Sequence, residues 1–285
     1  MERIDKRIGF IGAGNMGEAI ISGLIKSNLC KAGQIWASDV RGARLSELKK
    51  LYKINTAENN AGLFDAVDIV VLSVKPQQMK EVLDGLSRVV VHKIGTPTLL
   101  ISIAAGFPIR MIEKHLYNRL DENSRRLLPI VRVMPNTPAL VLAGMAGMSG
   151  NRYVRESDLS AARMILGAIG KVIEFKEKEL DAVTALSGSG PAYVFYFVEA
   201  LIEAGTRLGL KKSDALTLIL ETIKGSVKLL EETGETPLSL RKKVTSKGGT
   251  TEAALGVLKK HSVKDLLIKA IIAAAQRSRQ LSESG

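Results

Sequence analysis

The chain has 285 residues, of which 46% are hydrophobic, and this length and composition predict a globular protein of one large domain or two ordinary ones. The single cysteine, Cys30, excludes a disulfide framework, and the first residues lack a charged head followed by an apolar core, so we expect a cytoplasmic protein. The net charge of +12 is scattered along the chain, with one tryptophan and six phenylalanines available for stacking, so no nucleic-acid partner is expected.

In the first part of the chain, short β-branched runs alternate with amphipathic stretches. Strands are expected at residues 8–11, 35–38, 69–74, 99–104, 130–134, 145–149 and 172–175, with helices between most of them, such as 17–27 and 45–51. This alternation predicts an α/β fold with a parallel, doubly wound, Rossmann-like sheet. The polar tract 117–128 is expected to be an exposed loop. We place this first domain at residues 1–176.

After Lys178 the β-type runs stop, and helices are expected at 191–210, 213–233, 237–244, 250–260 and 263–281. Two of these helices have proline in the first turn, Pro191 and Pro237. The first helix is apolar around most of its circumference, and its polar residues recur at four-residue spacing, which indicates a helix rather than a membrane span. Residues 177–285 are therefore expected to be an all-helical domain that forms a homodimer or a higher oligomer of dimers.

Three glycines follow the first predicted strand. Gly12, Gly14 and Gly17 fit the pattern GxGxxG, which here links a strand to a helix, with Asn15 and Met16 between the last two glycines. In a dinucleotide site the first glycine permits a tight turn, the second lets the backbone approach a diphosphate, and the third allows close packing of helix on strand. The helix N-terminus also attracts phosphate. The segment predicts a dinucleotide-binding turn.

The end of the second predicted strand carries two opposing signals for the adenosine ribose. Ser38, Arg41 and Arg44 favour the 2′-phosphate of NADP(H), because a small polar residue with a nearby arginine accommodates that group. Asp39 instead fits the ribose 2′-hydroxyl of NAD(H). The sequence therefore favours NADP(H) and leaves NAD(H) open.

Four further segments do not read as ordinary connections, namely VLSVKPQ (71–77), RVMPNTPA (132–139), LSGSGPAYVF (186–195) and VTSKGGTTEAAL (244–255). With the glycine pattern before them, these segments resemble the pyrroline-5-carboxylate reductase family in the right order over essentially the whole chain. SGSGPAY and GGTT are the specific features of this resemblance. The resemblance implies reduction of 1-pyrroline-5-carboxylate to L-proline by NAD(P)H, the last step of proline biosynthesis.

The late segment suits the binding of a carboxylate. It precedes a helix, so backbone N–H groups around Gly249 and Thr250 can converge on an anion at the positive end of that helix. A simpler alternative is that Thr250 only caps the helix. The resemblance implies that Ser246 and Thr250 contact the substrate carboxylate and that the Thr251 hydroxyl serves the imine nitrogen. The family usually has proline where this chain has Lys247, a departure that bears on substrate affinity.

The resemblance also implies the rest of the site. Thr251 is the expected catalytic residue, and the substrate would be bound by Ser246, Gly248, Gly249, Thr250, Thr251, Ser187 and Gly188. The cofactor would be bound by Gly12, Gly14, Asn15, Met16, Gly17, Ser38, Arg41, Asn60, Val74, Lys75, Pro76, Ala104, Pro135, Asn136 and Thr137. For Pro76, formation of a turn is the simpler interpretation.

The inventory of side chains matches this chemistry, because hydride addition to a protonated imine needs alignment more than a strong base. All three histidines lie outside the motifs, and no metal site is expected. One alternative is a β-hydroxyacid dehydrogenase, but such an enzyme needs a lysine after the glycine-rich helix entry, and residues 190–195 contain none. Another is a dinucleotide-sensing protein without catalysis, which would have no use for the carboxylate site.

Overall fold

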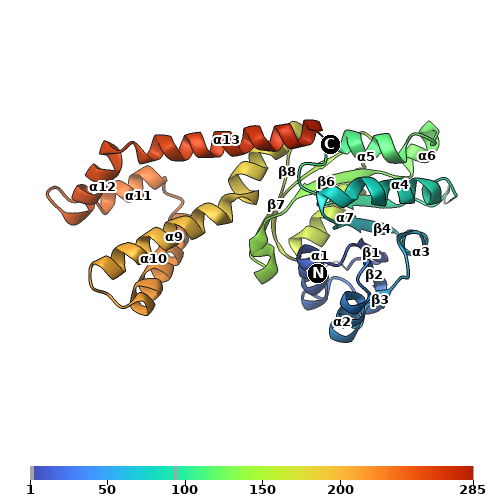
Figure 1. Cartoon of the computed structure of the whole chain (residues 1–285), viewed down its shortest axis with the longest axis horizontal. Coiled ribbons are helices and arrows are strands. Elements are labelled where there is room, and N and C mark those ends of the chain that lie inside the picture. The colour runs from blue at the N-terminus through green and yellow to red at the C-terminus, as the bar shows by residue number, and fades with distance from the viewer. Residues whose placement is uncertain (1–2, 93–94, 285) are drawn as a thin grey trace. The chain divides into compact units, whose positions relative to one another are not determined.

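The computed structural model describes residues 3–92 and 95–284, which divide into two compact units (Figure 1). Unit 1 is the chain up to Ser189 together with the segment from Ala274 onward. Unit 2 is Gly190–Ala273. Each unit has its own architecture and is described separately.

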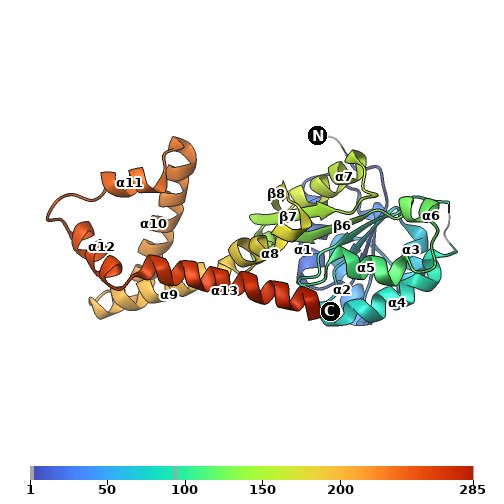
Figure 2. The same ribbon diagram turned by 90° about the horizontal axis from the view of Figure 1, so that it is seen from above.

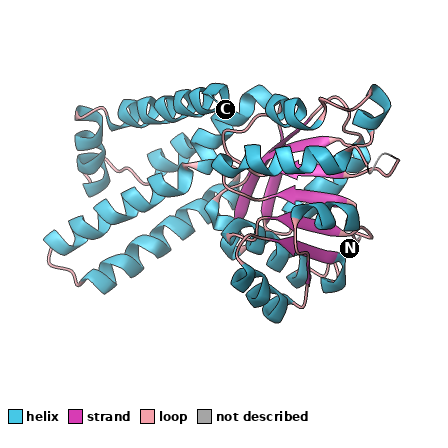
Figure 3. Ribbon diagram, turned by 45° about the vertical axis from the view of Figure 1, so that its right-hand side comes forward, coloured by secondary structure: helices cyan, strands magenta, loops and turns pink. Residues whose placement is uncertain are grey.

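Unit 1 is built on an eight-stranded sheet with strand order β3-β2-β1-β4-β5-β6-β7-β8 (Figure 3, magenta). The strands are β1 (Ile8–Ile11), β2 (Ile35–Ser38), β3 (Asn55–Thr56), β4 (Ile69–Leu72), β5 (Leu99–Ser102), β6 (Ile130–Met134), β7 (Gly144–Gly150) and β8 (Gly170–Glu174). All neighbouring strands are parallel except β6 and β7, which are antiparallel. The connection 135–143 between β6 and β7 holds just one short 3₁₀ turn, which is too little chain for a crossover helix. The expected doubly wound sheet is thus confirmed, with one antiparallel pair.

Helices cover both faces of this sheet (Figure 2). They are α1 (Asn15–Lys26), α2 (Gly42–Tyr52), α3 (Asn60–Ala66), α4 (Met79–Val90), α5 (Ile109–Leu116), α6 (Glu122–Arg126), α7 (Glu156–Gly167) and α8 (Leu180–Val183). One apolar cluster packs α1, α2 and α7 on the sheet, and a second packs α3, α4 and α5 on the opposite face. Burial on both sides explains why the inner strands read as continuous apolar runs. The sheet is the rigid scaffold on which strand-end loops are displayed.

Some sequence predictions for unit 1 differ from the structure. The strands predicted at 69–74 and 99–104 end two residues earlier, at Leu72 and Ser102, because the apolar run continues into buried loop residues such as Ile103. The two-residue edge strand β3 was missed, since it has no apolar pattern and forms by register with β2.

The tract 117–128, predicted as an exposed loop, is instead partly helical and partly buried. It contains α6, and Tyr117, Leu120 and Leu128 are core residues. The Tyr117 hydroxyl donates to the Leu128 carbonyl at 2.6 Å, and its ring packs edge-on against Tyr153. Because most residues of the tract are polar, its sequence did not indicate that these three residues are buried.

Unit 2 is all-helical, as predicted, and contains α9 (Gly190–Arg207), α10 (Lys212–Thr233), α11 (Pro237–Lys243), α12 (Thr250–Lys260) and the first part of α13 (Val263–Ser284). A short turn joins α9 to α10, and the two helices pack against each other (Figure 3). Ala215 is the sole fully buried residue of unit 2, packed where Gly205 leaves room for its methyl group. Within the described ranges no helix is long and apolar enough to cross a membrane.

Candidate functional site

One cavity of unit 1 lies where the order of the strands reverses. The chain runs outward from β1 through β2 to β3 and then returns to the other side of β1 with β4, so the carboxyl ends of β1 and β4 flank the switch point. Ligands of open α/β sheets bind at such a point. The cavity of about 440 Å³ is lined by Ile11, Gly12, Gly14, Ser38, Asp39, Val40, Arg41, Asn60, Ser73, Val74, Lys75, Gln78, Glu81, Val82 and Gly85. Seven residues predicted to bind the cofactor are therefore brought together here, namely Gly12, Gly14, Ser38, Arg41, Asn60, Val74 and Lys75.

The glycine-rich turn has the geometry that a diphosphate site requires. Gly12 has φ +89° and a Cβ there would lie 2.8 Å from the Ser73 carbonyl, so only glycine fits the turn. A Cβ at Gly17 would lie 3.0 Å from the Gly12 carbonyl, as expected for close helix packing. A Cβ at Gly14 would meet nothing within 4 Å, so this backbone faces open space. The turn thus fits the predicted cofactor.

Helix α1 begins directly after this turn. Asn15, Met16 and Gly17 form its first turn, and no side chain of the described residues caps it at Gly14. Ser73 supports the turn from β4, since its hydroxyl donates to the Gly12 carbonyl at 2.5 Å and to the Ile11 carbonyl at 3.2 Å. The positive end of α1 therefore points its N–H groups toward the region where phosphates bind in this fold.

Asp39 turns its carboxylate toward the glycine loop. Oδ2 accepts from the Ala13 backbone N–H at 2.8 Å, and Oδ1 accepts from the Arg41 backbone N–H at 2.9 Å and from Arg41 Nε at 3.1 Å. Only 8% of the Asp39 side chain is exposed. Burial alone would raise the pKa of this carboxyl, but the hydrogen bonds from Arg41 and Ala13 and the charge of Arg41 outweigh it and hold the pKa below its ordinary value. Asp39 is thus ionised and connects the end of β2 to the glycine-rich loop through its hydrogen bond from Ala13.

Of the other charged and polar groups at the ribose end, some line the cavity and some hold the surrounding protein in place. Arg41 leaves 62% of its side chain exposed at the cavity. Arg44 is occupied elsewhere: Nε donates to the Ala13 carbonyl at 2.8 Å, the guanidinium pairs with Glu18 and Glu47, and Arg44 is not among the cavity-lining residues. The Ser38 hydroxyl donates to Asn60 Oδ1 at 2.8 Å, so these two predicted residues form one polar wall.

The predicted nicotinamide end is distributed over three neighbouring strand ends. Val74 and Lys75 follow β4 and line the cavity, whereas Pro76 opens a 3₁₀ turn, Pro76–Gln78, and does not. Ala104 follows β5 and is buried. Residues 135–137 follow β6 at the same edge, because β4, β5 and β6 are parallel.

Asn136 joins this edge to the SGSG segment. Its Oδ1 accepts from the Met145 N–H at 2.9 Å, and its Nδ2 donates to the Ser187 hydroxyl at 3.2 Å. Gly188 lies against Met134, where a Cβ would come within 2.5 Å of the methionine methyl group. The structure therefore brings Ser187 and Gly188 to the Pro135–Asn136–Thr137 loop, two segments that the sequence analysis assigned to different ligands.

Ser187 and Gly188 do not sit in an ordinary loop. Residues Thr184–Gly188 form a π-helical turn between α8 and α9, with Ser189 N–H donating to the Thr184 carbonyl at 2.8 Å. π-turns of this kind occur frequently at functional sites. The sequence signal for it was the pair of glycines, Gly188 and Gly190, on either side of Ser189.

In unit 2, the residues predicted to hold a carboxylate form the N-terminus of α12. Gly249 is the N-cap and Thr250 is the first helical residue, so Thr250 itself is not the cap. Gly248 has φ +72°, a conformation that favours glycine, and a Cβ at Gly249 would lie 2.5 Å from the Ser246 Oγ and 3.1 Å from the Ser246 carbonyl oxygen. The Gly248 N–H donates to the carboxylate of Glu252 at 2.7 Å. This turn therefore binds a carboxylate oxygen through its backbone in the structure itself.

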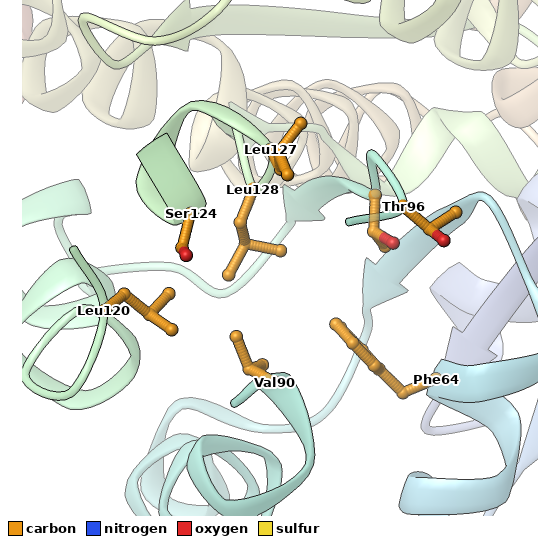
Figure 4. A pocket seen from close by; sticks show the side chains of 8 residues that line it. Phe64, Val90, Thr96, Leu120, Ser124, Leu127 and Leu128 are labelled. Carbon is orange, nitrogen blue, oxygen red and sulfur yellow. The ribbon is translucent and has the colours of Figure 1, made fainter. Parts of the chain in front are cut away.

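A second, much smaller cavity lies at the opposite, amino edge of the sheet (Figure 4). Its lining residues are Phe64, Val90, Thr96, Thr98, Leu120, Ser124, Leu127 and Leu128, and its volume is about 20 Å³. Thr98 Oγ1 is buried there without a partner among the described residues. The space suits one water molecule and excludes a cofactor.

Some cavity residues were missed by the sequence analysis. Ser73 lies inside a segment that was singled out, but it received no role. Gln78, Glu81, Val82 and Gly85 come from the start of α4 and its preceding turn, and their spacing carries no local signal. Among the described residues, no group of three or more histidine, cysteine or acidic side chains is placed to hold a metal ion.

The fold and the glycine turn define a dinucleotide-binding protein of the Rossmann class. A family model described as "NADP oxidoreductase coenzyme F420-dependent" matches residues 7–106, and one described as "Pyrroline-5-carboxylate reductase dimerisation" matches residues 177–281. Pyrroline-5-carboxylate reductase 2 of Bacillus subtilis is 37% identical over 98% of this chain and 96% of its own length. The chain belongs to the pyrroline-5-carboxylate reductase family.

Solved structures agree with this assignment. The pyrroline-5-carboxylate reductase of Coxiella burnetii is 38% identical, with a TM-score of 0.88, and the match covers 98% of this chain and 99% of that one. The Plasmodium falciparum pyrroline carboxylate reductase, solved with NADP bound, is 32% identical, with a TM-score of 0.83 and the same coverage. The resemblance inferred from the motifs is therefore confirmed.

Proposed function

We propose that this chain reduces 1-pyrroline-5-carboxylate to L-proline by hydride transfer from NAD(P)H, the last step of proline biosynthesis. The observation that carries the proposal is a dinucleotide cavity at the switch point of the sheet in a chain that belongs over its full length to the reductase family. In this reaction the reduced nicotinamide would supply a hydride that forms a new C–H bond at the imine carbon, the imine nitrogen would take up one proton, and the C=N double bond would become a C–N single bond, leaving oxidised nicotinamide.

The residues of this chain have to hold two ligands and direct one proton. Gly12, Gly14 and the first turn of α1 bind the diphosphate, and the strand ends after β4, β5 and β6 form the surface for the nicotinamide. Alignment of two reactants by such rigid strand ends accounts for much of the rate gain in reactions of this type. Ser187 and Gly188 complete this end of the site.

The substrate carboxylate is assigned to the N-terminus of α12. Ser246, Gly248, Gly249 and Thr250 would bind it, and the Gly248 N–H bond to a carboxylate oxygen in the structure supports this role. The Thr251 hydroxyl, one residue further into the helix, would donate its hydrogen bond to the imine nitrogen.

We propose NADP(H) as the preferred cofactor, with NAD(H) as the weaker alternative. Asp39 already accepts hydrogen bonds from the Ala13 and Arg41 backbone N–H groups and is mostly buried, so its carboxylate is less available to a ribose 2′-hydroxyl. Arg41 is exposed at the cavity and is the cation available to a 2′-phosphate. The NADP bound in the Plasmodium reductase supports the same preference.

The test is a nicotinamide absorbance assay with the purified full chain. Loss of NADPH absorbance with 1-pyrroline-5-carboxylate, together with formation of proline, is the expected result. NADP⁺ reduction with 3-hydroxyisobutyrate would favour a β-hydroxyacid dehydrogenase instead. NADPH binding without turnover of either substrate would favour a dinucleotide sensor.

We also propose that the protein is a homodimer, or a higher oligomer of dimers, associated through unit 2. Helices α9, α10, α12 and α13 expose many large apolar side chains, for example Phe195, Leu218 and Ile272, while Ala215 alone is buried in that unit. Such a unit cannot be stabilised by its own core and needs a partner surface. Light scattering after gel filtration should give at least twice the monomer mass, and a monomer at micromolar concentration would exclude this assembly.

Three further assignments complete the proposal. We place the dinucleotide-binding domain at residues 1–176 and the helical substrate-binding and dimerisation domain at 177–285. The protein is proposed to act in the cytoplasm, where a lone buried thiol such as Cys30 stays reduced, and to bind no nucleic acid. Cell fractionation and a DNA or RNA mobility-shift assay test these two points.

A further inference from the structure

The carboxylate of Glu177 lies where three segments of unit 1 meet. Glu177 begins the 3₁₀ turn Glu177–Glu179, which leads through α8 to the π-turn with Ser187 and Gly188. Its Oε1 accepts from the Ile109 backbone N–H at 2.7 Å and from Arg132 Nη1 at 3.1 Å. These partners lie 68 and 45 residues away in the sequence.

Each contact of Glu177 reaches a loop of the proposed nicotinamide surface. Ile109 is the first residue of α5 and directly follows the loop 103–108, which contains Ala104. Arg132 lies on β6, three residues before Pro135. One carboxylate oxygen of Glu177 therefore connects the end of the loop after β5 to strand β6, which leads into the loop after β6. Glu177 itself lies at the start of the segment that leads through α8 to the π-turn.

The energetics make this arrangement specific. Only 6% of the Arg132 side chain is exposed, against 33% for Glu177, so the guanidinium is desolvated and needs its partner. The Ile109 N–H lies in the first turn of α5, where a negative charge is stabilised by the helix dipole. If the Glu177 carboxylate moved away, the Arg132 guanidinium would lose its ionic partner and the Ile109 N–H would lose its acceptor.

The same loop is braced on its other side by the end of α13, which belongs to unit 1. A Cβ at Gly106 would lie 3.3 Å from the Leu281 Cβ, and Gly106 has φ +70°. The Arg110 guanidinium donates to the Ser282 carbonyl at 2.7 Å, and the Ser278 hydroxyl donates to Asp181 at 2.6 Å. The loop and the start of α5 are thus held on one side by α13 and on the other by the charged carboxylate of Glu177.

We infer that Glu177 is a positioning residue for hydride transfer: its carboxylate fixes the two strand-end loops against which the nicotinamide ring would lie. This inference rests on the proposed function. Glu177 touches neither the adenosine end nor the glycine turn, so its loss should leave the affinity for the adenosine half of the cofactor unchanged and should disturb the nicotinamide half.

The test compares four variants with the wild-type full chain. Glu177→Ala removes the tie, and Glu177→Gln keeps an oxygen that can accept from the Ile109 N–H. Glu179→Ala is the matched control, because Glu179 lies on the same turn and its carboxylate accepts a local hydrogen bond from the Lys176 N–H. The double variant Glu177→Ala/Arg132→Leu removes both charges, so that no buried guanidinium is left unpaired.

Three measurements separate positioning from general stability. The dissociation constant of 2′,5′-ADP reports the adenosine end, the fluorescence change of bound NADPH reports the surroundings of the reduced nicotinamide, and the single-turnover rate, checked by its deuterium isotope effect, reports hydride transfer. For Glu177→Ala we expect unchanged 2′,5′-ADP binding, a smaller fluorescence change and a single-turnover rate lower by roughly 10- to 100-fold. Glu177→Gln should recover most of the rate, and Glu179→Ala should match the wild type.

A wild-type single-turnover rate and fluorescence change in Glu177→Ala would overturn the inference. If that variant does not fold, the double variant decides: slow transfer with normal 2′,5′-ADP binding supports positioning, and wild-type behaviour overturns it. If the wild-type chain binds NADPH but does not reduce the imine, the proposed function fails, while the fluorescence comparison still decides the role of Glu177.

Discussion

Replacing Arg41 and Asp39 separately should have different effects on the two cofactors. The Arg41 guanidinium is exposed at the cavity and is available to a 2′-phosphate, which NADPH has and NADH lacks. The Asp39 carboxylate holds the Ala13 N–H of the glycine loop, which both cofactors need. Arg41→Ala should therefore weaken NADPH selectively, and Asp39→Ala should weaken NADPH and NADH alike.

The expected magnitudes follow from the contacts. A hydrogen bond between a guanidinium and a phosphate contributes about 1.5–3 kcal/mol, or roughly 10- to 100-fold in the dissociation constant. Because 62% of the Arg41 side chain is exposed and therefore screened by water and salt, we expect the lower end, about tenfold. Loss of the Asp39 acceptor leaves the Ala13 N–H unsatisfied in a partly buried loop, a cost of about 1–3 kcal/mol that is common to both cofactors.

The assay is titration of each variant with NADPH, NADH, 2′,5′-ADP and 5′-AMP at two salt concentrations. Arg163→Ala is the matched control, because it removes one exposed arginine on α7 that pairs with Glu156 and Glu174 outside the cavity. The preference for 2′-phosphorylated ligands should fall with salt in the wild type and be lost in Arg41→Ala. The reasoning is refuted if Asp39→Ala changes the NADPH-to-NADH ratio more than roughly tenfold, the shift expected of a lost ribose ligand.

Four other predictions test separate parts of the protein. Thr251→Ala should lower kcat by roughly 10- to 1,000-fold, within the range for lost proton or hydrogen-bond assistance, and unchanged steady-state kinetics would remove Thr251 from the mechanism. Gly14→Val should prevent NADPH binding by filling the open face of the loop, with circular dichroism showing a retained fold; wild-type affinity would place the diphosphate elsewhere. Glu252→Ala should lower the KM for the imine acid by about two- to fivefold, because it frees the Gly248 N–H and removes a competing carboxylate, whereas an unchanged KM would show that the turn does not bind substrate. Burial raises the pKa of the Cys30 thiol to about 11, so a thiol reagent at pH 8 should react with it only after unfolding, and rapid reaction of the native protein would contradict its buried position.

The elements of this fold could be predicted from the sequence wherever local pattern decides them. β1, β2 and β6 were predicted with the bounds observed, because each is a short β-branched run that ends at a turn signal. The glycine turn was likewise predictable, since Gly12 needs a positive φ and Gly17 needs to be small for reasons that depend on its immediate neighbours. Helix α12 began at Thr250 as predicted because two glycines interrupt the chain before it.

Long-range partners could not be predicted in the same way. Nothing local in the tract 117–128 indicates that Tyr117 will hydrogen-bond Leu128 and pack on Tyr153, so its polarity suggested an exposed loop. The pairing of β7 against β6 in the antiparallel sense depends on the shortness of the connection between them. The packing of Tyr117 on Tyr153 joins residues too far apart in the sequence for a local pattern to show it.

The ribose end shows why such partners matter for function as well as for fold. In sequence, the acidic residue after β2 and the arginine two positions later indicate opposite cofactors, and both readings use the same local rule. In the structure the two residues have different surroundings. The Asp39 carboxylate accepts from the Ala13 N–H and is mostly buried, whereas the Arg41 side chain is largely exposed. An acidic residue at this position therefore specifies NAD(H) only when its carboxylate is free to reach the ribose. Because Arg44, the other candidate cation of this segment, is held by Glu18 and Glu47, we expect the discrimination between the two cofactors to depend on Arg41, whose side chain is largely exposed although it also pairs with Asp39.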